Sequence, residues 1–312
     1  MPGEAPSGAE PVHLAAVGPA ISTSSLTKRY GDRLALDGLD LEVPRGLVFG
    51  FLGPNGAGKT TAVKLLLGLA RPTGGEGKVL GAPLGDRPIR SKVGYLPELF
   101  RYQGWLSARE VLVLHCQLAG LPQHQVREEV ERGLEVVGLE GRGDDHVATF
   151  SKGMQQRLGL AVALLGAPEL VILDEPTSAL DPVGRHDVRE IIRKLRADGV
   201  TVFLNSHFLS EVELVCDRVA IVDRGKVVAQ GGLAELLEGG GPRVRCTGLT
   251  VSTLDRLGAL RTDGDWVWVE GLDSSRTPDL VEALVGVGAR VHQVEEGRRS
   301  LEERFLQLLE RP

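Results

Sequence analysis

Residues 53–60, Gly-Pro-Asn-Gly-Ala-Gly-Lys-Thr, match the pattern G-x-x-x-x-G-K-[ST], and this octet restricts the possible folds more than any other feature of the sequence. The apolar stretch Leu47–Leu52 before it predicts a buried strand. After it, apolar residues recur with the spacing of one helix face: Val63, Leu66, Leu67 and Ala70. A strand, this octet and a helix together predict a loop that binds the phosphates of a nucleoside triphosphate.

The residue types in the octet suit phosphate binding. Its glycines let the backbone wrap closely around phosphate groups, so that amide N–H groups point inward. The N-terminus of the following helix adds partial positive charge, Lys59 reaches the terminal phosphates, and the Thr60 hydroxyl can ligate Mg²⁺. The residues expected to contact the nucleotide here are Gly53, Pro54, Asn55, Gly56, Ala57, Gly58, Lys59, Thr60 and Thr61.

The length and charge of the chain limit the classes of protein to which it can belong. A length of 312 residues predicts two domains, or a large domain and a small one. A net charge of −6 argues against a nucleic-acid partner, because a surface that follows phosphates usually carries a basic excess. No stretch reaches the roughly 18 to 20 apolar residues of a membrane helix. If the protein serves a membrane, we therefore expect another chain to span it.

The N-terminus and the cysteines favour a cytoplasmic protein. Residues 1–20 are rich in Pro, Gly and Ala and lack the charged start and apolar core of a signal peptide, so we expect a disordered tail there. Cys116, Cys216 and Cys246 are odd in number and widely separated. That pattern argues against a disulfide framework or a zinc site and indicates reduced thiols.

The hydrophobic pattern predicts an α/β core. Residues 21 to about 46 alternate loosely and suit an antiparallel β region, and residues from about 99 to 165 are mostly helical in pattern. Further along, a helix with apolar residues from Val188 to Leu195 lies between the first two of three short apolar strands: Leu170–Leu173, Val200–Leu204 and Val219–Val222. Strands that alternate with helices predict a largely parallel sheet with helices on both faces.

A second, smaller domain is predicted at the C-terminus. The pattern breaks near Gly239–Pro242, which is typical of a linker, so we expect a nucleotide-binding domain at 21–240 and a small α+β domain at 241–312. The expected elements of the small domain are the strands Arg243–Cys246, Trp266–Val269 and Arg290–Val294 and the helices Asp279–Val287 and Leu301–Leu309. No internal repeat occurs, so the chain contains one nucleotide-binding unit.

Two carboxylates follow the strand Leu170–Leu173. In an open α/β sheet a buried strand ends at the ligand crevice, so these side chains are expected beside the nucleotide. Asp174 can hold Mg²⁺ through water, as the second acidic strand does in phosphate-loop enzymes. Glu175 can face the γ-phosphate and orient or deprotonate the attacking water.

The segment Phe150–Arg157 precedes that strand, and Ser151 and the backbone at Gly153 could cap a helix and bind phosphate. The segment resembles the signature of the ABC ATPases, Leu-Ser-Gly-Gly-Gln before an arginine-containing helix. The resemblance implies that Ser151, Gly153 and Met154 contact the γ-phosphate of ATP bound to the other protomer, so that a head-to-tail dimer encloses two nucleotides. A plain N-cap by Ser151 is the alternative, which the position between the octet and the acidic strand disfavours.

The segment departs from that signature at three positions. Phe150 replaces leucine, Lys152 replaces the first of the paired glycines, and Met154 replaces glutamine. The Ser-Lys-Gly-Met form is similar to that of exporter-type subunits of the family. Two interpretations of Lys152 stay open: a cationic contact with the nucleotide, or a solvated charge.

Other motifs of the family follow in family order over residues 21 to about 235. Tyr30 resembles the aromatic residue that stacks on adenine, with a simple β-sheet tyrosine as the alternative. Glu98 stands where the family normally has the glutamine that couples Mg²⁺ to the membrane partner; a carboxylate can ligate Mg²⁺ but adds charge near the phosphates. Ser178 and Asp181 match the loop that links the two ATP sites across the dimer, and His207 matches the switch histidine that contacts the γ-phosphate and holds the catalytic glutamate.

The resemblance implies a fold, an activity and partners. The implied fold is a P-loop NTPase, RecA-like α/β core with an antiparallel β subdomain and an α-helical subdomain at about 99–165, plus the small C-terminal α+β domain. We expect a Mg²⁺-dependent ATP hydrolase in which Lys59, Glu175 and His207 are catalytic, with Thr60, Glu98 and Asp174 at the metal. It would energise export through a separate transmembrane permease, as a homodimer or heterodimer on the cytoplasmic face of the cell membrane.

A soluble ABC ATPase of the translation or DNA-repair type is the main alternative. Translation-type members carry two cassettes, whereas this chain has one. Repair-type members insert coiled coils or zinc modules between phosphate loop and signature, but the segment between Lys59 and Ser151 has neither heptads nor cysteine pairs. A nucleotide-binding regulator without turnover is a third possibility, disfavoured by Glu175 and His207.

A cluster of large apolar residues directly follows the Mg²⁺-sensing loop: Leu99, Phe100, Tyr102, Trp105 and Leu106. Clustered aromatic side chains are favoured anchors of protein interfaces. We expect part of this cluster to form the groove that receives a cytoplasmic helix of the membrane subunit. The alternative is that the cluster packs the core of the helical subdomain, with Trp105 the most internal.

Overall fold

The computed structural model describes residues 18–178, 180–237, 241–249, 260–269, 272, 274–295 and 300–309. Most of the predicted disordered tail, up to residue 17, lies outside the described residues, as do Ala179 of the predicted dimer loop and residues 238–240 of the predicted linker. In the described part of the chain, no helix combines the length and the apolar character needed to cross a membrane.

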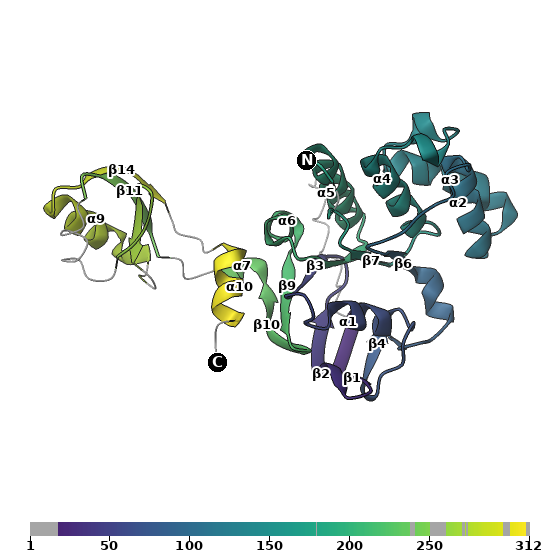
Figure 1. Cartoon of the computed structure of the whole chain (residues 1–312), viewed down its shortest axis with the longest axis horizontal. Helices are drawn as coiled ribbons and strands as arrows, with labels where there is room; N and C mark the ends of the chain where they lie inside the picture. The colour runs from purple at the N-terminus through teal and green to yellow at the C-terminus, as the bar shows by residue number, and fades with distance from the viewer. Residues whose placement is uncertain are drawn as a thin grey trace, which may run out of the picture.

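A six-stranded sheet forms the centre of the molecule (Figure 1). In spatial order the strands are β10 (Lys226–Gly232), β9 (Arg218–Asp223), β3 (Val48–Leu52), β8 (Thr201–Asn205), β7 (Leu170–Asp174) and β6 (Val93–Leu96). The strands from β9 to β6 are parallel to one another, and β10 closes one edge as an antiparallel strand. The predicted largely parallel sheet is confirmed.

The central strands β3, β7 and β8 are fully buried and mostly apolar, and their successive side chains alternate between the two faces of the sheet. On β7, Leu170 and Ile172 face one core, while Val171 and Leu173 face the other. Phe203 of β8 joins the first core, where its ring stacks on Phe49 with centroids 6.0 Å apart. Because both faces are covered, these strands lack the polar alternation of a half-exposed sheet.

One face of the sheet is covered by α1 (Lys59–Leu66) and a small antiparallel sheet. In spatial order the strands of this small sheet are β2 (Arg33–Val43), β1 (Ile21–Tyr30), β4 (Gly74–Val79) and β5 (Ala82–Pro83). The predicted antiparallel region is confirmed. The helix α1 ends before Ala70, which the spacing had placed on it, because Gly68 adopts a positive φ of 64° that ends the helix.

The other face of the sheet is covered by helices. The helices are α2 (Ala108–Leu118), α3 (Gln123–Val136), α4 (Lys152–Ala163), α5 (Pro182–Ala197), α6 (Leu209–Val215) and α7 (Leu233–Leu237). The core on this side joins the strands to α4, α5 and α6, and α2 and α3 pack onto α4 as a helical subdomain. Short 3₁₀ turns span Pro88–Lys92, Glu140–Arg142 and Val147–Thr149.

The loop between β6 and α2 distributes its aromatic residues differently from the sequence expectation. Trp105, expected to be internal, is 73% exposed, and Leu99 is 87% exposed. Tyr102 instead packs against the core of the helical subdomain, in contact with Phe100 and His115, and burial raises the pKa of its hydroxyl. An irregular loop has no periodicity that could tell inward from outward positions, which explains the reversal.

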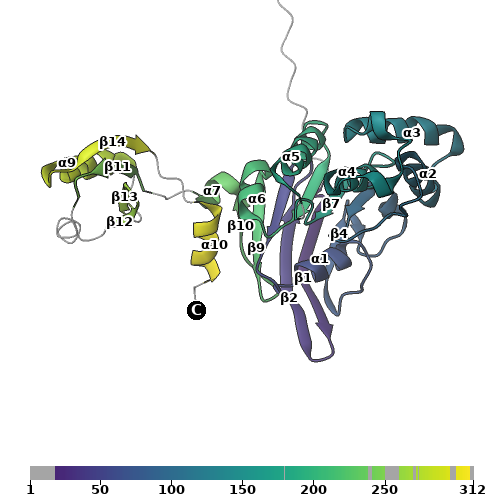
Figure 2. The same ribbon diagram turned by 45° about the horizontal axis from the view of Figure 1, so that its top comes forward.

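The C-terminal strands and α9 form a module with its own small core, set apart from the central sheet in both views (Figure 2). The module contains β12 (Leu260–Asp263), β13 (Trp266–Val269), β11 (Arg243–Thr247) and β14 (Arg290–Glu295), with α9 (Thr277–Gly286). The sequence assigned the last helix, α10 (Leu301–Leu309), to this module. Instead α10 packs against α6 and α7, with Leu301 fully buried in the core of the central domain.

Candidate nucleotide-binding site

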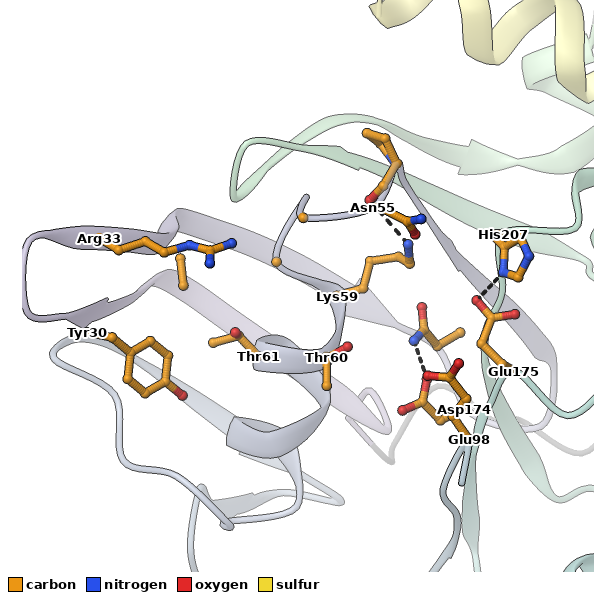
Figure 3. A pocket seen from close by; sticks show the side chains of 15 residues that line it. Tyr30, Arg33, Asn55, Lys59, Thr60, Thr61, Glu98, Asp174, Glu175 and His207 are labelled. Carbon is orange, nitrogen blue, oxygen red and sulfur yellow. Dashed lines mark hydrogen bonds and ion pairs between the residues drawn. The ribbon is translucent and has the colours of Figure 1, made fainter. Parts of the chain in front are cut away.

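A cavity of about 510 Å³ lies where four parts of the central domain meet (Figure 3). These are the β1–β2 turn, the phosphate-loop octet with the start of α1, the loop after β6, and the carboxyl ends of β7 and β8. The lining residues are Tyr30, Arg33, Ala35, Pro54, Asn55, Gly56, Gly58, Lys59, Thr60, Thr61, Glu98, Asp174, Glu175, Asn205 and His207. The structure thus brings most of the predicted site residues together in one cavity.

The octet leaves β3 and enters α1 through a turn that needs glycine at two positions. A Cβ atom at Gly53 would lie 2.3 Å from the carbonyl oxygen of Val222, and one at Gly58 would lie 2.5 Å from that of Ala35. Gly58 also has a φ of 105°, in the region that side chains disfavour. Gly53 and Ala57 belong to this turn but do not line the cavity.

The ammonium group of Lys59 folds back onto the start of the octet. Its Nζ donates hydrogen bonds to the carbonyl oxygens of Gly53 and Pro54, at 2.6 and 3.3 Å. Burial lowers the pKa of Lys59, and the nearby carboxylates Glu175 and Asp174 oppose that shift. A cation held near a helix N-terminus provides the charge that the terminal phosphates of a nucleotide require.

Asp174 ends β7 and is held by Asn205, which ends the neighbouring parallel strand β8. The Asn205 amide donates a hydrogen bond to Asp174 Oδ1, and burial raises the pKa of the Asp174 carboxyl. Sequence reasoning missed Asn205. The only available signal was its place one residue after an apolar strand that the parallel sheet pairs with the acidic one.

Glu175 has the most unusual geometry in the site. Its backbone φ is 52°, a left-handed conformation that is strained for a glutamate, and its amide donates to the carbonyl oxygen of Asn205. Glu175 Oε1 lies 2.7 Å from Nδ1 of His207, whereas Oε2 is buried and has no hydrogen-bond partner among the described residues. Burial raises the pKa of this carboxyl, and the hydrogen bond from His207 opposes the shift.

The opposite end of the cavity is formed by the β1–β2 turn (Figure 3). Tyr30 ends β1 and is 47% exposed, and the Lys28 ammonium lies 4.8 Å from its ring centroid. Arg33, which the sequence did not single out, starts β2 as the partner of Tyr30 and also lines the cavity. An exposed ring and a guanidinium at this end can stack on a planar base.

The donor set between α1 and β7 suits Mg²⁺ bound together with phosphate. The Thr60 hydroxyl and the carboxylates of Glu98 and Asp174 supply oxygen ligands at one cavity, as this hard cation prefers. Within the described ranges, no group of three or more His, Cys, Asp or Glu side chains could bind a metal alone. That fits a cation held by one or two protein oxygens, water and the substrate phosphates.

The predicted signature residues do not reach this cavity. Ser151 caps α4, because its Oγ accepts a hydrogen bond from the amide of Met154 at 3.2 Å. Ser151, Gly153 and Met154 line a second cavity of about 370 Å³ together with Asp181. Lys152 is exposed, Phe150 is buried in the core, and Ser178 lines neither cavity.

The sequence matches a protein-family model and several known relatives. Residues 36–178 match the family model described as ABC transporter. An uncharacterized ABC transporter ATP-binding protein of Nostoc sp. is 42% identical over 302 residues, which cover 93% of this chain and 90% of that protein. The Nod factor export ATP-binding protein I of Burkholderia thailandensis is 40% identical over 220 residues, which cover 70% of this chain and 72% of that protein.

The fold also matches solved structures. A dimeric ATP-binding cassette in a post-hydrolysis state, bound to ADP and Pi, superposes with a TM-score of 0.61 and 25% identity, covering 68% of this chain and 98% of that one. The matched regions extend well beyond the phosphate loop. The chain therefore belongs to the ATP-binding, ATP-hydrolysing subunits of ABC transporters.

Proposed function

We propose that this chain binds Mg²⁺-ATP in the cavity of Figure 3 and that its hydrolysis energises export through a separate membrane subunit. The observation that carries the proposal is the convergence of Lys59, Asp174, Glu175 and His207 on one cavity behind a phosphate loop. Such convergence of cation, acid and base at the ends of parallel strands is the arrangement that phosphoryl transfer requires.

In this proposal each side chain has one task. Lys59 and the amides of the octet neutralise the charge of the terminal phosphates. The free Oε2 of Glu175 accepts a hydrogen bond from water and orients it for attack, while His207 holds Oε1 and keeps the carboxylate in place. Bound Mg²⁺ supplies further charge neutralisation, and Thr60, Asp174 and Glu98 are the residues that would hold it.

We further propose that two copies, or this chain and a related subunit, assemble head to tail. The predicted γ-phosphate contacts are divided between two separate cavities, one with Lys59 and Glu175 and one with Ser151 and Gly153. A head-to-tail dimer would bring the second cavity of one protomer over the first cavity of its partner. The similar solved cassette is dimeric, which supports assembly of this chain as a dimer.

The direction of transport and the membrane partner rest on two observations. A relative at 40% identity is named for Nod factor export, which supports export for this chain as well. Leu99 and Trp105 are strongly exposed on the loop that directly follows Glu98, a residue of the nucleotide cavity. Exposed large apolar side chains that directly follow Glu98 suit a docking surface for a cytoplasmic segment of the membrane subunit.

The experiment that tests this proposal replaces these exposed side chains. The double variant Leu99→Ala, Trp105→Ala should weaken co-purification with a membrane subunit identified among the neighbouring genes by roughly tenfold or more and reduce transport. Its thermal stability and basal ATPase activity should stay near those of the parent. Leu118→Ala is the matched control, because Leu118 is 74% exposed at the end of α2.

Tyr102→Ala is a poor probe of the same surface, since Tyr102 packs the core and its loss should lower stability directly. Unchanged co-purification of the Leu99, Trp105 double variant, or equal loss in the Leu118 control, would remove this loop as the docking surface. Absence of any ATP-dependent transport with the neighbouring membrane protein would reject the exporter assignment itself.

A further inference from the structure

Two helices begin directly after loops that the proposed function uses. The helix α5 starts at Pro182, after the loop with Ser178 and Asp181, and α6 starts at Leu209, two residues after His207. Both helices cover the same face of the central sheet, and they pack against each other. A side chain near the two helix starts can therefore connect the dimer loop to the switch histidine.

Arg185, in the first turn of α5, makes that connection. Its Nε donates a hydrogen bond of 3.1 Å to the carbonyl oxygen of Leu180 in the dimer loop. Its guanidinium also lies over the ring of Phe208, with Cζ 4.9 Å from the ring centroid. The planar guanidinium can hold both contacts at once because it donates at its edge and stacks through its face.

Phe208 in turn contacts His207. The two rings lie 4.1 Å apart between centroids with an angle of 37° between their planes. The Phe208 backbone is fixed in turn, because its amide donates to Ser206 Oγ at 3.1 Å. The His207 side chain is 48% exposed, so burial alone does not fix its orientation, and both the Phe208 ring and the Glu175 carboxylate contact it.

Helix packing does not depend on Arg185. Farther along the same helices, Arg189 makes two hydrogen bonds to the Glu211 carboxylate, at 3.0 and 2.9 Å, and both side chains are largely buried. Val188 and Ile192 of α5 also lie in the main core. Loss of the Arg185 side chain should therefore leave α5 and α6 in place and change only the contacts around His207.

We infer that Arg185 is a positioning residue for ATP hydrolysis, which acts through Phe208 to set the orientation of His207 and so of the Glu175 carboxylate. The contacts form one continuous path from the carbonyl of Leu180 to Glu175. Contact of one protomer with the dimer loop of its partner would thereby change the catalytic geometry of the partner. The inference rests on the proposed roles of His207 and Glu175.

The test measures steady-state ATP hydrolysis by the full-length protein. Arg185→Ala and Phe208→Leu should each lower kcat about tenfold with little change in KM, because they disturb geometry and leave nucleotide contacts intact. The double variant should lose no more than the more damaged single variant, as expected for residues on one path. Phe208→Tyr keeps the ring and should retain kcat within about twofold.

Arg193→Ala is the matched control, since Arg193 also bridges α5 to α6, at the carbonyl of Leu214, far along the helices from His207. It should leave kcat near the parent value, and all variants should keep similar melting temperatures. Additive losses in the double variant, an equal loss in Arg193→Ala, or unchanged kcat in Arg185→Ala would overturn the inference.

A His207→Ala background separates this inference from the proposed function. Once His207 is absent, adding Arg185→Ala should cause no further loss of kcat. If His207→Ala itself leaves kcat unchanged, the proposed role of His207 fails. If His207→Ala lowers kcat but Arg185→Ala does not, the proposed role stands and the positioning path is rejected.

Discussion

Glu175 combines a strained backbone with a buried carboxylate oxygen that lacks a partner, and both features cost stability. Strain and unsatisfied polar groups of this kind persist where a function requires them. Glu175 lines the cavity that also contains Lys59 and Asp174. These features agree with the catalytic role that we propose for Glu175.

Glu175→Gln should separate binding from hydrolysis. The amide keeps the size and one acceptor of the carboxylate but cannot take a proton, so kcat should fall by about 10²-fold or more. ATP affinity should be retained, and a stable ATP-bound dimer should accumulate, visible as a shift in size-exclusion chromatography. Parent-like turnover in this variant would remove Glu175 from the mechanism.

The pH dependence of kcat should also report on Glu175. Burial raises the pKa of this carboxyl, and the base is active only when charged, so activity should be lost as the pH falls through that raised value. The acid limb should thus lie above the pKa of about 4.3 of a free glutamate. The His207 hydrogen bond lowers the same pKa, so the residual activity of His207→Ala should show an acid limb at still higher pH. If the acid limb of the pH profile does not move in His207→Ala, the limb reports on a group other than Glu175.

Among individual residues, the sequence predicted those that belong to a recognisable motif and missed the site residues that belong to none. Asp174 and Glu175 could be predicted because an apolar run ends in two acids beside a phosphate loop. Asn205 and Arg33 are single polar residues at a strand end and a turn, where no pattern distinguishes them. The contact of Glu175 with His207 depends on the pairing of β7 with β8, which only the folded sheet establishes.

Among the elements, α10 has a role that its own sequence does not reveal. Its apolar side chains Leu301, Phe305 and Leu308 have the spacing of one helix face, which predicted the helix. That spacing says nothing about the surface on which the face packs. Contacts with α6 and α7 place it on the central domain, and the amide of Leu301 donates to Glu213 of α6 at 3.2 Å.

Leu301→Ala should therefore destabilise the central domain. Leu301 is fully buried, and truncation of a buried leucine typically costs about 2 to 5 kcal/mol, so the melting temperature should fall by several degrees. Leu306→Ala on the same helix is the control, because Leu306 is 51% exposed and its loss should change stability little. Equal effects of the two changes on thermal unfolding would mean that α10 does not dock as described.

At the scale of the whole molecule, the two parts of the proposed nucleotide site do not meet within one chain. The cavity with Lys59 and the cavity with Ser151 are separate, and each opens on its own set of elements. A sequence motif can identify both halves, but it cannot show that they are apart in one folded chain. A composite site between protomers is the arrangement that uses both.

Mixed dimers can test that arrangement with the same two lesions placed differently. In a head-to-tail dimer, a Ser151→Arg protomer paired with a Lys59→Ala protomer keeps one intact site, because both lesions fall in the other site. When one protomer carries both changes and its partner is unaltered, each site receives one lesion. Dimers purified through two different tags should therefore show about half of the parent ATPase activity in the first arrangement and far less in the second. The opposite order would mean that each site is built within a single protomer.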